Sequence, residues 1–224
     1  MGTKLVYHTQ ASQSGGISPF DEAIHEVSNG EELLIACPYI DVGYIAPFLS
    51  KQKDWRIISD VEAWLSTFQG NSRDKIIRLI TENKSRVHHY KNLHAKVILG
   101  NNLCLFGSAN FTRMGVTERV EMSVLVEDVS YINEIHEWFD NLWLCSGEVD
   151  LKELENYAQN SIKETLQIGK DDVHLTSKSP IIRAKTSVEF ADQASKVSSE
   201  VSQKNDLSRR ERKVYRNSDF DQNF

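Results

Sequence analysis

Apolar and polar residues alternate along the chain in blocks that predict strands and helices in turn. Short apolar runs bounded by Gly, Pro, Asn or Asp predict β-strands, and residues with apolar positions three and four apart predict amphipathic helices. Strands are expected over residues 31–40, 54–60, 86–99, 102–110 and 120–128, and helices over residues 18–30, 71–84 and 131–145, with a short helix or turn at 42–51. A break in the third strand is expected near Lys91 and Asn92. This alternation predicts an α/β sandwich between about residues 15 and 146.

The pattern changes after this region. Residues 151–168 are predicted as one further helix, and from about Lys170 the chain becomes polar, rich in Ser and Lys and poor in aromatics. We therefore expect a domain over residues 1–169 and a flexible or partner-dependent tail over residues 170–224. The tail carries a basic cluster that could touch nucleic acid, although such clusters are more often solvated. The cluster consists of Arg209, Arg210, Arg212, Lys213 and Arg216.

Composition and charge restrict the possible functions. Residues 1–150 hold 13 basic and 20 acidic side chains, a balance of −7, whereas residues 151–224 hold 13 and 12, a balance of +1. An acidic domain argues against a broad surface that coats nucleic acid, but not against a locally positive cleft. No apolar run approaches the roughly 18–20 residues of a membrane span, and residues 1–16 do not resemble a secretion signal. We expect a soluble cytoplasmic protein.

The three cysteines do not suggest a disulfide framework or a metal site. The number of cysteines is odd, and no two of them are close in sequence: they are Cys37, Cys104 and Cys145. Two of them lie in apolar strand-like runs, so they are interpreted as small buried residues of a reducing compartment.

The most apolar hairpin of the chain contains four polar residues. Gly100, Asn101 and Asn102 separate two apolar runs and predict the turn, with either Gly100–Asn101 or Asn101–Asn102 at its centre. Folding back places position 94 opposite position 107 or 109. His94 and Lys96 alternate with apolar residues on one run, and Ser108 and Asn110 do so on the other.

We therefore expect these four side chains to meet at one place. Together they could hydrogen-bond an anion, and the imidazole could act as a nucleophile. The alternative is that Lys96 extends into solvent and His94 is a satisfied core histidine. The presence of four such groups in one hairpin favours the site.

These residues resemble the signature of the phospholipase D superfamily. The signature is His-x-Lys, four residues, Asp, and then Gly-Ser-x-Asn or a close variant. The matching residues are His94, Lys96, Gly107, Ser108 and Asn110, and Glu121 resembles the acidic residue that follows on the next strand. "LLIACPYI" and "DWRIISD" also resemble the first two strands of that family, so the resemblance extends from about residue 18 to 144. It implies an α-β-α sandwich with a mixed central sheet.

The sequence departs from the signature at one position. Asn101 stands where the family usually has Asp, and the interval to Gly107 is one residue short. In the family this Asp is thought to support the loop, and Asn can turn a chain in a similar way.

The resemblance implies a phosphodiesterase that works through a phosphohistidine without a cofactor or a metal. His94 would be the nucleophile, Lys96, Ser108 and Asn110 would bind the phosphate oxygens, and Glu121 would orient an imidazole. A second histidine must protonate the leaving oxygen. Because the chain has one complete motif, and single-motif members of the family form two-fold dimers, we expect a homodimer with His94 of both subunits in one active site.

Other interpretations stay open at this point. The sequence places His88 and His89 near His94, as in a metal site, but it offers no Asp, Glu or Cys at the usual spacing to complete a set of ligands. The favoured function is a DNA endonuclease, with DNA preferred over RNA as the substrate and a partner subunit as one way to choose a target. The alternatives are a phospholipase or phosphatidyltransferase, and a non-catalytic nucleic-acid-binding or assembly module of the same fold.

Overall fold

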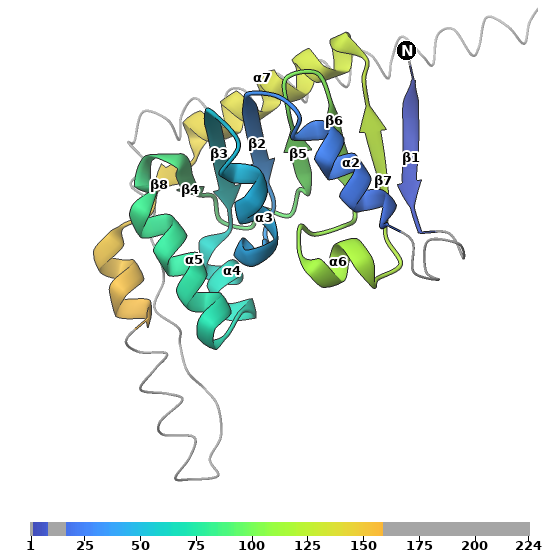
Figure 1. Ribbon diagram of the computed structural model, residues 1–224. Helices are drawn as coiled ribbons and strands as arrows, with labels where there is room; N and C mark the ends of the chain where they lie inside the picture. Colours follow the sequence, from blue (N-terminus) through green and yellow to red (C-terminus); the bar gives the residue numbers. More distant parts are fainter. Residues whose placement is uncertain (1, 9–16, 159–224) are drawn as a thin grey trace, which may run out of the picture. The chain divides into compact units, whose positions relative to one another are not determined.

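The computed structural model describes residues 2–8 and 17–158. Within them, eight strands form one mixed sheet in the order β1-β7-β6-β5-β2-β3-β4-β8 (Figure 1). The strands are β1 (Thr3–Tyr7), β2 (Glu32–Ala36), β3 (Asp54–Ser59), β4 (Val87–His89), β5 (Val97–Leu99), β6 (Cys104–Gly107), β7 (Met122–Val126) and β8 (Gly147–Glu148). The pairs β2–β3 and β3–β4 are parallel, and the other pairs are antiparallel. The predicted mixed sheet is confirmed.

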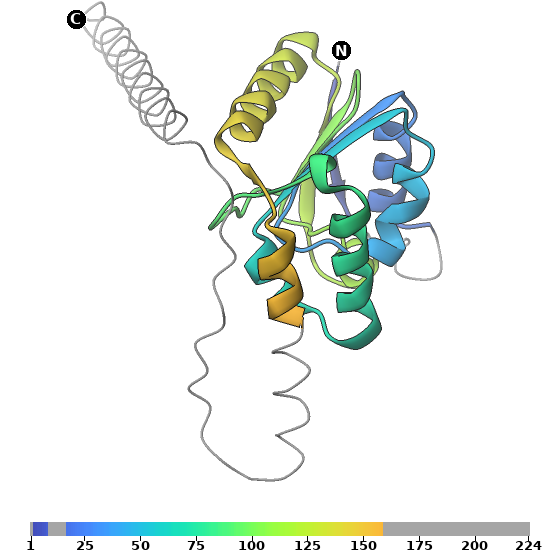
Figure 2. The same cartoon turned by 90° about the vertical axis from the view of Figure 1, so that its left-hand side faces the viewer.

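Helices lie on both faces of this sheet, as the α/β prediction requires. They are α2 (Pro19–Val27), α3 (Val42–Leu49), α4 (Val61–Thr67), α5 (Gly70–Glu82), α6 (Arg113–Thr117) and α7 (Val129–Cys145), with a 3₁₀ turn η1 (Lys84–Arg86). Seen edge-on in Figure 2, α7 lies on one side of the sheet and α2, α3 and α5 lie on the other.

The sheet separates two apolar cores because successive strand residues point to opposite faces. In β2, Leu33 and Ile35 belong to the core under α2, α3 and α5, whereas Leu34 and Ala36 belong to the core under α7. All four side chains are fully buried. Strand β2 therefore lies at the centre of the fold, and its neighbour β5 is the first strand of the hairpin of interest.

Five of the six helices α2 to α7, all except α5, begin at a residue whose side-chain oxygen accepts a hydrogen bond from the first turn. Ser18 caps α2 by accepting a hydrogen bond from Phe20 N, at 3.2 Å, and Pro19 occupies the first turn. Asp60 caps α4 through Ala63 N, at 3.1 Å. Such acceptors satisfy backbone amides that have no partner within the helix.

Several predicted elements are confirmed, with shorter bounds. The strand predicted over residues 86–99 is broken, since β4 ends at His89 and β5 starts at Val97, and Asn92 between them has a positive φ of 62°. The strand predicted to reach Asn110 ends at Gly107. Strands β1 and β8 and helices α4 and α6 were not predicted: β8, α4 and α6 are short, and only Val6 of β1 is buried.

The predicted C-terminal features fall mostly outside the described residues. A helical stretch covers residues 151–158, the first part of the predicted helix over 151–168. The remainder of that helix, the tail over residues 170–224 and its basic cluster lie outside the residues that the structure describes. In the described part of the chain, none of the helices has the length and apolar character needed to cross a membrane.

The cysteines follow the prediction in two cases. All three are free; Cys37 and Cys104 are buried, and Cys145 is partly exposed. Burial raises the pKa of the Cys104 thiol to about 12, as expected for an inert core thiol.

Candidate active site

The turn end of the β5–β6 hairpin is tied to the start of β2 by Asn101. Gly100 N donates to Leu103 O at 2.9 Å, so Asn101 and Asn102 form the centre of the turn. Asn101 Oδ1 accepts hydrogen bonds from Glu31 N at 3.0 Å and from Glu32 N at 3.3 Å.

The contact also explains the glycine before β2. A Cβ on Gly30 would lie 2.3 Å from Asn101 Oδ1, so a side chain at position 30 would push the amide away. An aspartate oxygen at position 101 could accept the same two bonds. Asn101, although it differs from the Asp of the family signature, therefore supports the loop by accepting these two hydrogen bonds.

The opposite end of the hairpin presents His94 and Lys96. Lys96 is only 8% exposed, and its Nζ donates to the backbone oxygen of His94 at 3.0 Å. The same Nζ lies 3.4 Å from Nε2 and 3.5 Å from Nδ1 of the His94 ring. His94 itself is exposed. The alternative interpretation is therefore wrong, because Lys96 is buried and His94 is not.

A buried carboxylate holds the segment that leads to His94. Asp60 Oδ2 accepts a hydrogen bond from Asn92 N at 2.8 Å, while Oδ1 caps α4. Asn92 adopts the left-handed conformation that asparagine tolerates better than most residues. Asp60 thus connects the end of β3 to the turn two residues before His94. The sequence showed an Asp at the end of a predicted strand, but it did not indicate that this Asp would bind the backbone of Asn92, 32 residues away.

Ser108 and Glu121 form a second group at the same end of the sheet. Ser108 Oγ donates to Glu121 Oε2 and accepts from Met122 N at 3.0 Å, and Ser108 N donates to Met122 O at 3.0 Å. A Cβ on Gly107 would lie 2.4 Å from Met122 O, so only glycine permits β6 to approach β7 this closely. The contact between Glu121 and an imidazole, expected from the sequence, stays a prediction.

Asn110 contacts a residue that sequence reasoning missed. Cys37 Sγ lies 3.7 Å from Asn110 Oδ1 and donates weakly to it. Burial raises the pKa of Cys37 to about 11, and the positive charge of Lys96 opposes part of this shift. Cys37 therefore lies directly after β2 and beside Asn110. Its position after "LLIA" was the only sequence signal.

One step of the sequence argument was wrong. Val97 pairs with Phe106, so even-numbered residues of β5 stand opposite odd-numbered residues of β6. Strict alternation would place Lys96 and Ser108 on opposite faces of the sheet. Strand β6 ends at Gly107, however, and Ser108 to Asn110 continue as irregular chain. The polar residues reach the same end of the sheet through these irregular segments and not through alternation.

His88 and His89 have structural partners. The His88 ring stacks on Trp143 at 3.6 Å between centroids, and its Nδ1 lies 2.9 Å from Ser146 Oγ. His89 Nδ1 accepts a hydrogen bond from Val61 N at 3.0 Å. Burial lowers the pKa of both imidazoles. Within residues 2–8 and 17–158, no group of three His, Cys, Asp or Glu side chains is arranged to hold a metal ion.

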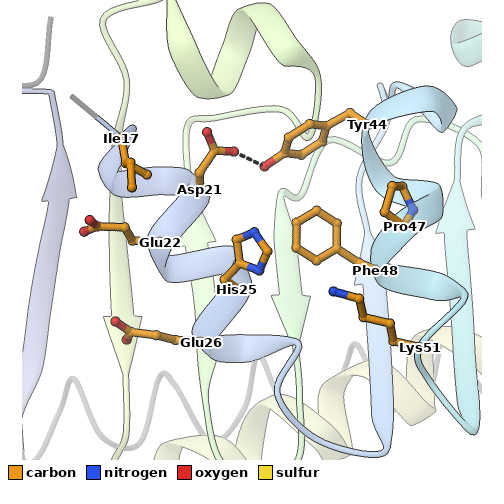
Figure 3. A pocket seen from close by; sticks show the side chains of 9 residues that line it. All are labelled: Ile17, Asp21, Glu22, His25, Glu26, Tyr44, Pro47, Phe48 and Lys51. Atoms are coloured by element: carbon orange, nitrogen blue, oxygen red, sulfur yellow. Dashed lines mark hydrogen bonds between the residues drawn. The ribbon is translucent and has the colours of Figure 1, made fainter. Parts of the chain in front are cut away.

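A cavity of about 880 Å³ lies elsewhere, between α2 and α3 (Figure 3). Tyr44 donates to Asp21 across it at 2.6 Å, and burial, together with this carboxylate, raises the pKa of the tyrosine. The residues that line it are Ile17, Asp21, Glu22, His25, Glu26, Tyr44, Pro47, Phe48 and Lys51. It contains none of the candidate site residues.

An α/β sandwich whose central hairpin carries His-x-Lys and Gly-Ser-x-Asn defines a phospholipase D-like domain. Residues 30–143 match the family model described as "cardiolipin synthase, PLD-like domain". This match covers 114 of 224 residues, and the chain belongs to the phospholipase D superfamily.

Solved structures support the fold. NucT from Helicobacter pylori is 15% identical and superimposes with a TM-score of 0.50 over 66% of this chain and 98% of its own. The phospholipase D family member Nuc from Salmonella typhimurium is 16% identical and superimposes with a TM-score of 0.52 over 66% of this chain and 97% of its own. Phosphatidylserine synthase from Haemophilus influenzae is 14% identical and superimposes with a TM-score of 0.53. This match covers 75% of this chain but only 46% of the synthase. A comparison with the sequences of curated proteins found no match.

Proposed function

We propose that this protein is a metal-independent phosphodiesterase, and specifically a DNA endonuclease, whose active site is completed by a second copy of the chain. The observation that carries the proposal is the pairing of His94 with Lys96. An exposed imidazole lies within 3.5 Å of an ammonium group that is buried and fixed by a backbone oxygen. This arrangement suits a nucleophile beside a fixed cation that binds a phosphate oxygen.

The proposed reaction has two steps. A ring nitrogen of His94 attacks phosphorus, the N–P bond forms and the P–O bond to the leaving group breaks. A second histidine gives its proton to the departing oxygen. That histidine then takes a proton from water, the water oxygen attacks phosphorus, and the N–P bond breaks to restore His94. Lys96, Ser108 and Asn110 would hold the non-bridging oxygens, and Glu121 would keep Ser108 in place.

The second histidine is not available from the described part of one chain. His8 lies next to β1, and β7 and β6 separate β1 from β5, so its distance from His94 is on the order of 14 Å at about 4.8 Å per strand. His88 and His89 have the partners described above. His25 lines the cavity between α2 and α3, and His136 lies 4.0 Å from Glu32 at the other end of β2. A second His94, from a two-fold related subunit, meets the requirement.

The extent of the structural matches supports a one-domain subunit. The chain spans 97–98% of Nuc and NucT but less than half of the phosphatidylserine synthase. Single-motif members of the superfamily are mostly DNA endonucleases, which favours nucleic acid over lipid as the substrate.

Cleavage of plasmid DNA in the presence of EDTA tests this proposal. The wild-type protein is expected to nick or linearise the plasmid, and the His94→Ala variant is expected to leave it intact. His25→Ala removes another exposed histidine, outside the site, and should cleave normally. A 32-phosphate label on the wild-type protein and not on His94→Ala, after a quench without acid, would reveal the covalent step.

Other outcomes separate the alternatives. Release of a phospholipid head group without cleavage of DNA or RNA would replace the nuclease with a phospholipase or phosphatidyltransferase. Salt-sensitive DNA binding without hydrolysis would indicate a non-catalytic binding module.

A further inference from the structure

Helices α2 and α3 lie side by side on one face of the sheet, with a cavity of about 880 Å³ between them, which we call the α2–α3 groove (Figure 3). Residues four apart share one face of a helix. The faces that line the groove carry Asp21 and His25 on α2 and Tyr44 and Phe48 on α3. Tyr44 donates to Asp21. The ring centroids of His25 and Phe48 lie 4.8 Å apart. These two contacts hold the helices together across the groove.

The α3 side of the groove is aromatic. Phe48 is only 6% exposed, and the ring of Tyr44 lies beside it with 5.7 Å between the centroids. Burial, together with Asp21, raises the pKa of Tyr44, so its hydroxyl stays protonated and keeps its hydrogen bond. Two exposed apolar residues, Ile17 and Pro47, also line the groove. An aromatic wall of this kind attracts cations and packs against the apolar part of a side chain.

The α2 side of the groove is acidic. Asp21 points toward Tyr44, and Glu22 and Glu26, one turn apart, form the outer edge of the groove (Figure 3). Lys51 lines the groove as well, so one ammonium group stands against three carboxylates. In the described part of the chain, neither Glu22 nor Glu26 takes part in an ion pair. The groove therefore carries an excess of negative charge.

The two glutamates are unfavourable for α2 itself. Glu22 and Glu26 are four residues apart, and like charges at this spacing destabilise a helix. Glu26 also lies in the last turn of α2, where the helix dipole disfavours a negative charge. The stability of the helix therefore does not account for these side chains, whereas a cation bound in the groove would relieve both effects.

The size and the charge of the groove define its occupant. The lining residues at α2 extend from Ile17 to Glu26, about 13 Å at the helical rise of 1.5 Å per residue, which is the length of about four residues of extended chain. The negative charge repels phosphate groups, and the groove contains none of the candidate active-site residues, so DNA does not fit this surface. An extended protein segment with positive side chains fits both the length and the charge.

We propose that the α2–α3 groove binds a basic segment of a partner protein. An arginine or lysine of this segment packs its aliphatic part on the rings of Tyr44 and Phe48, and its charge pairs with the carboxylates of α2. A partner held in this way does not occupy the candidate active site, so it can direct the protein to a target without blocking the reaction. The inference goes beyond the proposed function and does not depend on it, because it concerns binding at a separate surface.

Fluorescence anisotropy with a labelled peptide of alternating arginine and leucine tests the groove. The full-length wild-type protein is expected to bind this peptide saturably. The same peptide with citrulline for arginine keeps its shape, loses its charge and should bind at least ~5-fold more weakly. Glu22→Gln/Glu26→Gln should weaken binding of the arginine peptide ~5-fold, as for the loss of two exposed ion pairs. Asp74→Asn/Glu82→Gln is the matched control, since it removes two exposed carboxylates of α5 and should bind like the wild type.

Lys51→Gln should change the affinity in the opposite direction. It removes the ammonium group that repels the cations of the peptide, so binding should tighten about twofold, a result that misfolding cannot produce. Equal weakening in the α5 control would replace the groove with a general attraction to an acidic protein. No saturable binding, or equal binding of the citrulline peptide, would overturn the basic segment. Agmatine, arginine without its carboxyl group, should bind far more weakly than the peptide, and equal affinity would replace the partner protein with a small organic cation.

Discussion

The two ends of the β5–β6 hairpin are held by different means. At the turn end, the side chain of Asn101 accepts two backbone amides of the β2 start, and no charge is buried. At the opposite end, a buried ammonium and a buried carboxylate, Lys96 and Asp60, hold irregular chain around an exposed histidine. The first arrangement stabilises the fold without the desolvation cost of burying a charge. The second removes two charged groups from water, which costs free energy. The comparison suggests that stability and chemistry are separated along one hairpin, and substitutions at each end can test this.

Replacing Lys96 should have the largest effect on activity. Lys96→Met removes the cation beside His94, and the cleavage rate is expected to fall about 10²–10³-fold, as for the loss of a preorganised charge donor. The free energy of unfolding should stay the same or rise, because an apolar side chain replaces a buried charge. Plasmid cleavage and urea unfolding measure the two quantities. Lys91→Met, at an exposed lysine nearby, is the control, and a Lys96→Met protein that cleaves normally would contradict the assignment.

Replacing Asp60 should lower both activity and stability. Asp60→Ala leaves Asn92 N and Ala63 N without their acceptors, which should lower the free energy of unfolding by about 2–3 kcal/mol. The turn before His94 then loosens, and the cleavage rate of the folded fraction should fall about tenfold, in line with the cost of misplacing a reacting group.

Two variants sharpen the assignment of Asp60 as a positioning residue. Asp60→Asn keeps one acceptor oxygen and should give intermediate values in both assays. Asp128→Ala removes the cap of α7 without touching the segment before His94, and should not change the cleavage rate. A normal rate in Asp60→Ala would show that the carboxylate serves stability alone.

Replacing Asn101 should affect stability and not chemistry. Asn101→Ala loses the acceptor for Glu31 N and Glu32 N, and the exposed position limits the expected cost to about 1 kcal/mol. The rate per folded molecule should equal that of the wild type. Asn101→Asp, which restores the usual residue of the family signature, should keep the wild-type stability. A loss of cleavage in either folded variant would contradict the separation of the two ends.

A smaller effect is expected from pH. Burial lowers the pKa of His88 and His89, so below the unfolded value of 6.5 the unfolded chain binds protons that the folded chain does not. The free energy of unfolding should therefore be independent of these groups above pH 6.5 and decrease as the pH falls below it. Urea unfolding at pH 7.5 and pH 5.5 measures the difference, which should be smaller in His88→Gln. An equal difference in the free energy of unfolding between the two pH values in both proteins would show that His88 does not contribute.

The sequence predicted the elements that carry long apolar patterns and missed those defined by distant partners. Strands β2, β3, β5 and β7 and helices α2, α5 and α7 follow from periodicity, because each buries a complete face or stripe. Strand β1 was missed, since its burial is limited to Val6 and its place depends on pairing with β7. Helix α4 was missed because it spans only seven residues.

The candidate site was predictable as a set of residues but not as a geometry. The motif identified His94, Lys96, Ser108, Asn110 and Glu121, since it is local in sequence. The contributions of Asp60 and Cys37 depend on the packing of β2 and β3 beside the hairpin, which no local pattern encodes. Alternation misplaced Ser108 because residues opposite each other in this register have numbers of opposite parity, so Lys96 and Ser108 cannot share a face by alternation alone.

The strand order has a consequence for the sequence of folding events. Leu99 and Cys104 pair across a separation of 5 residues and Gly107 and Ser123 across 16, whereas Leu34 and Leu99 close a loop of 65 residues and Thr3 and Val126 one of 123. Closing a longer loop costs more entropy and delays the contact. In pulsed hydrogen exchange we expect the β5–β6–β7 meander to gain protection first and β1 last. The hairpin that carries His94 and Lys96 would then form before the edge of the sheet at β1 is complete.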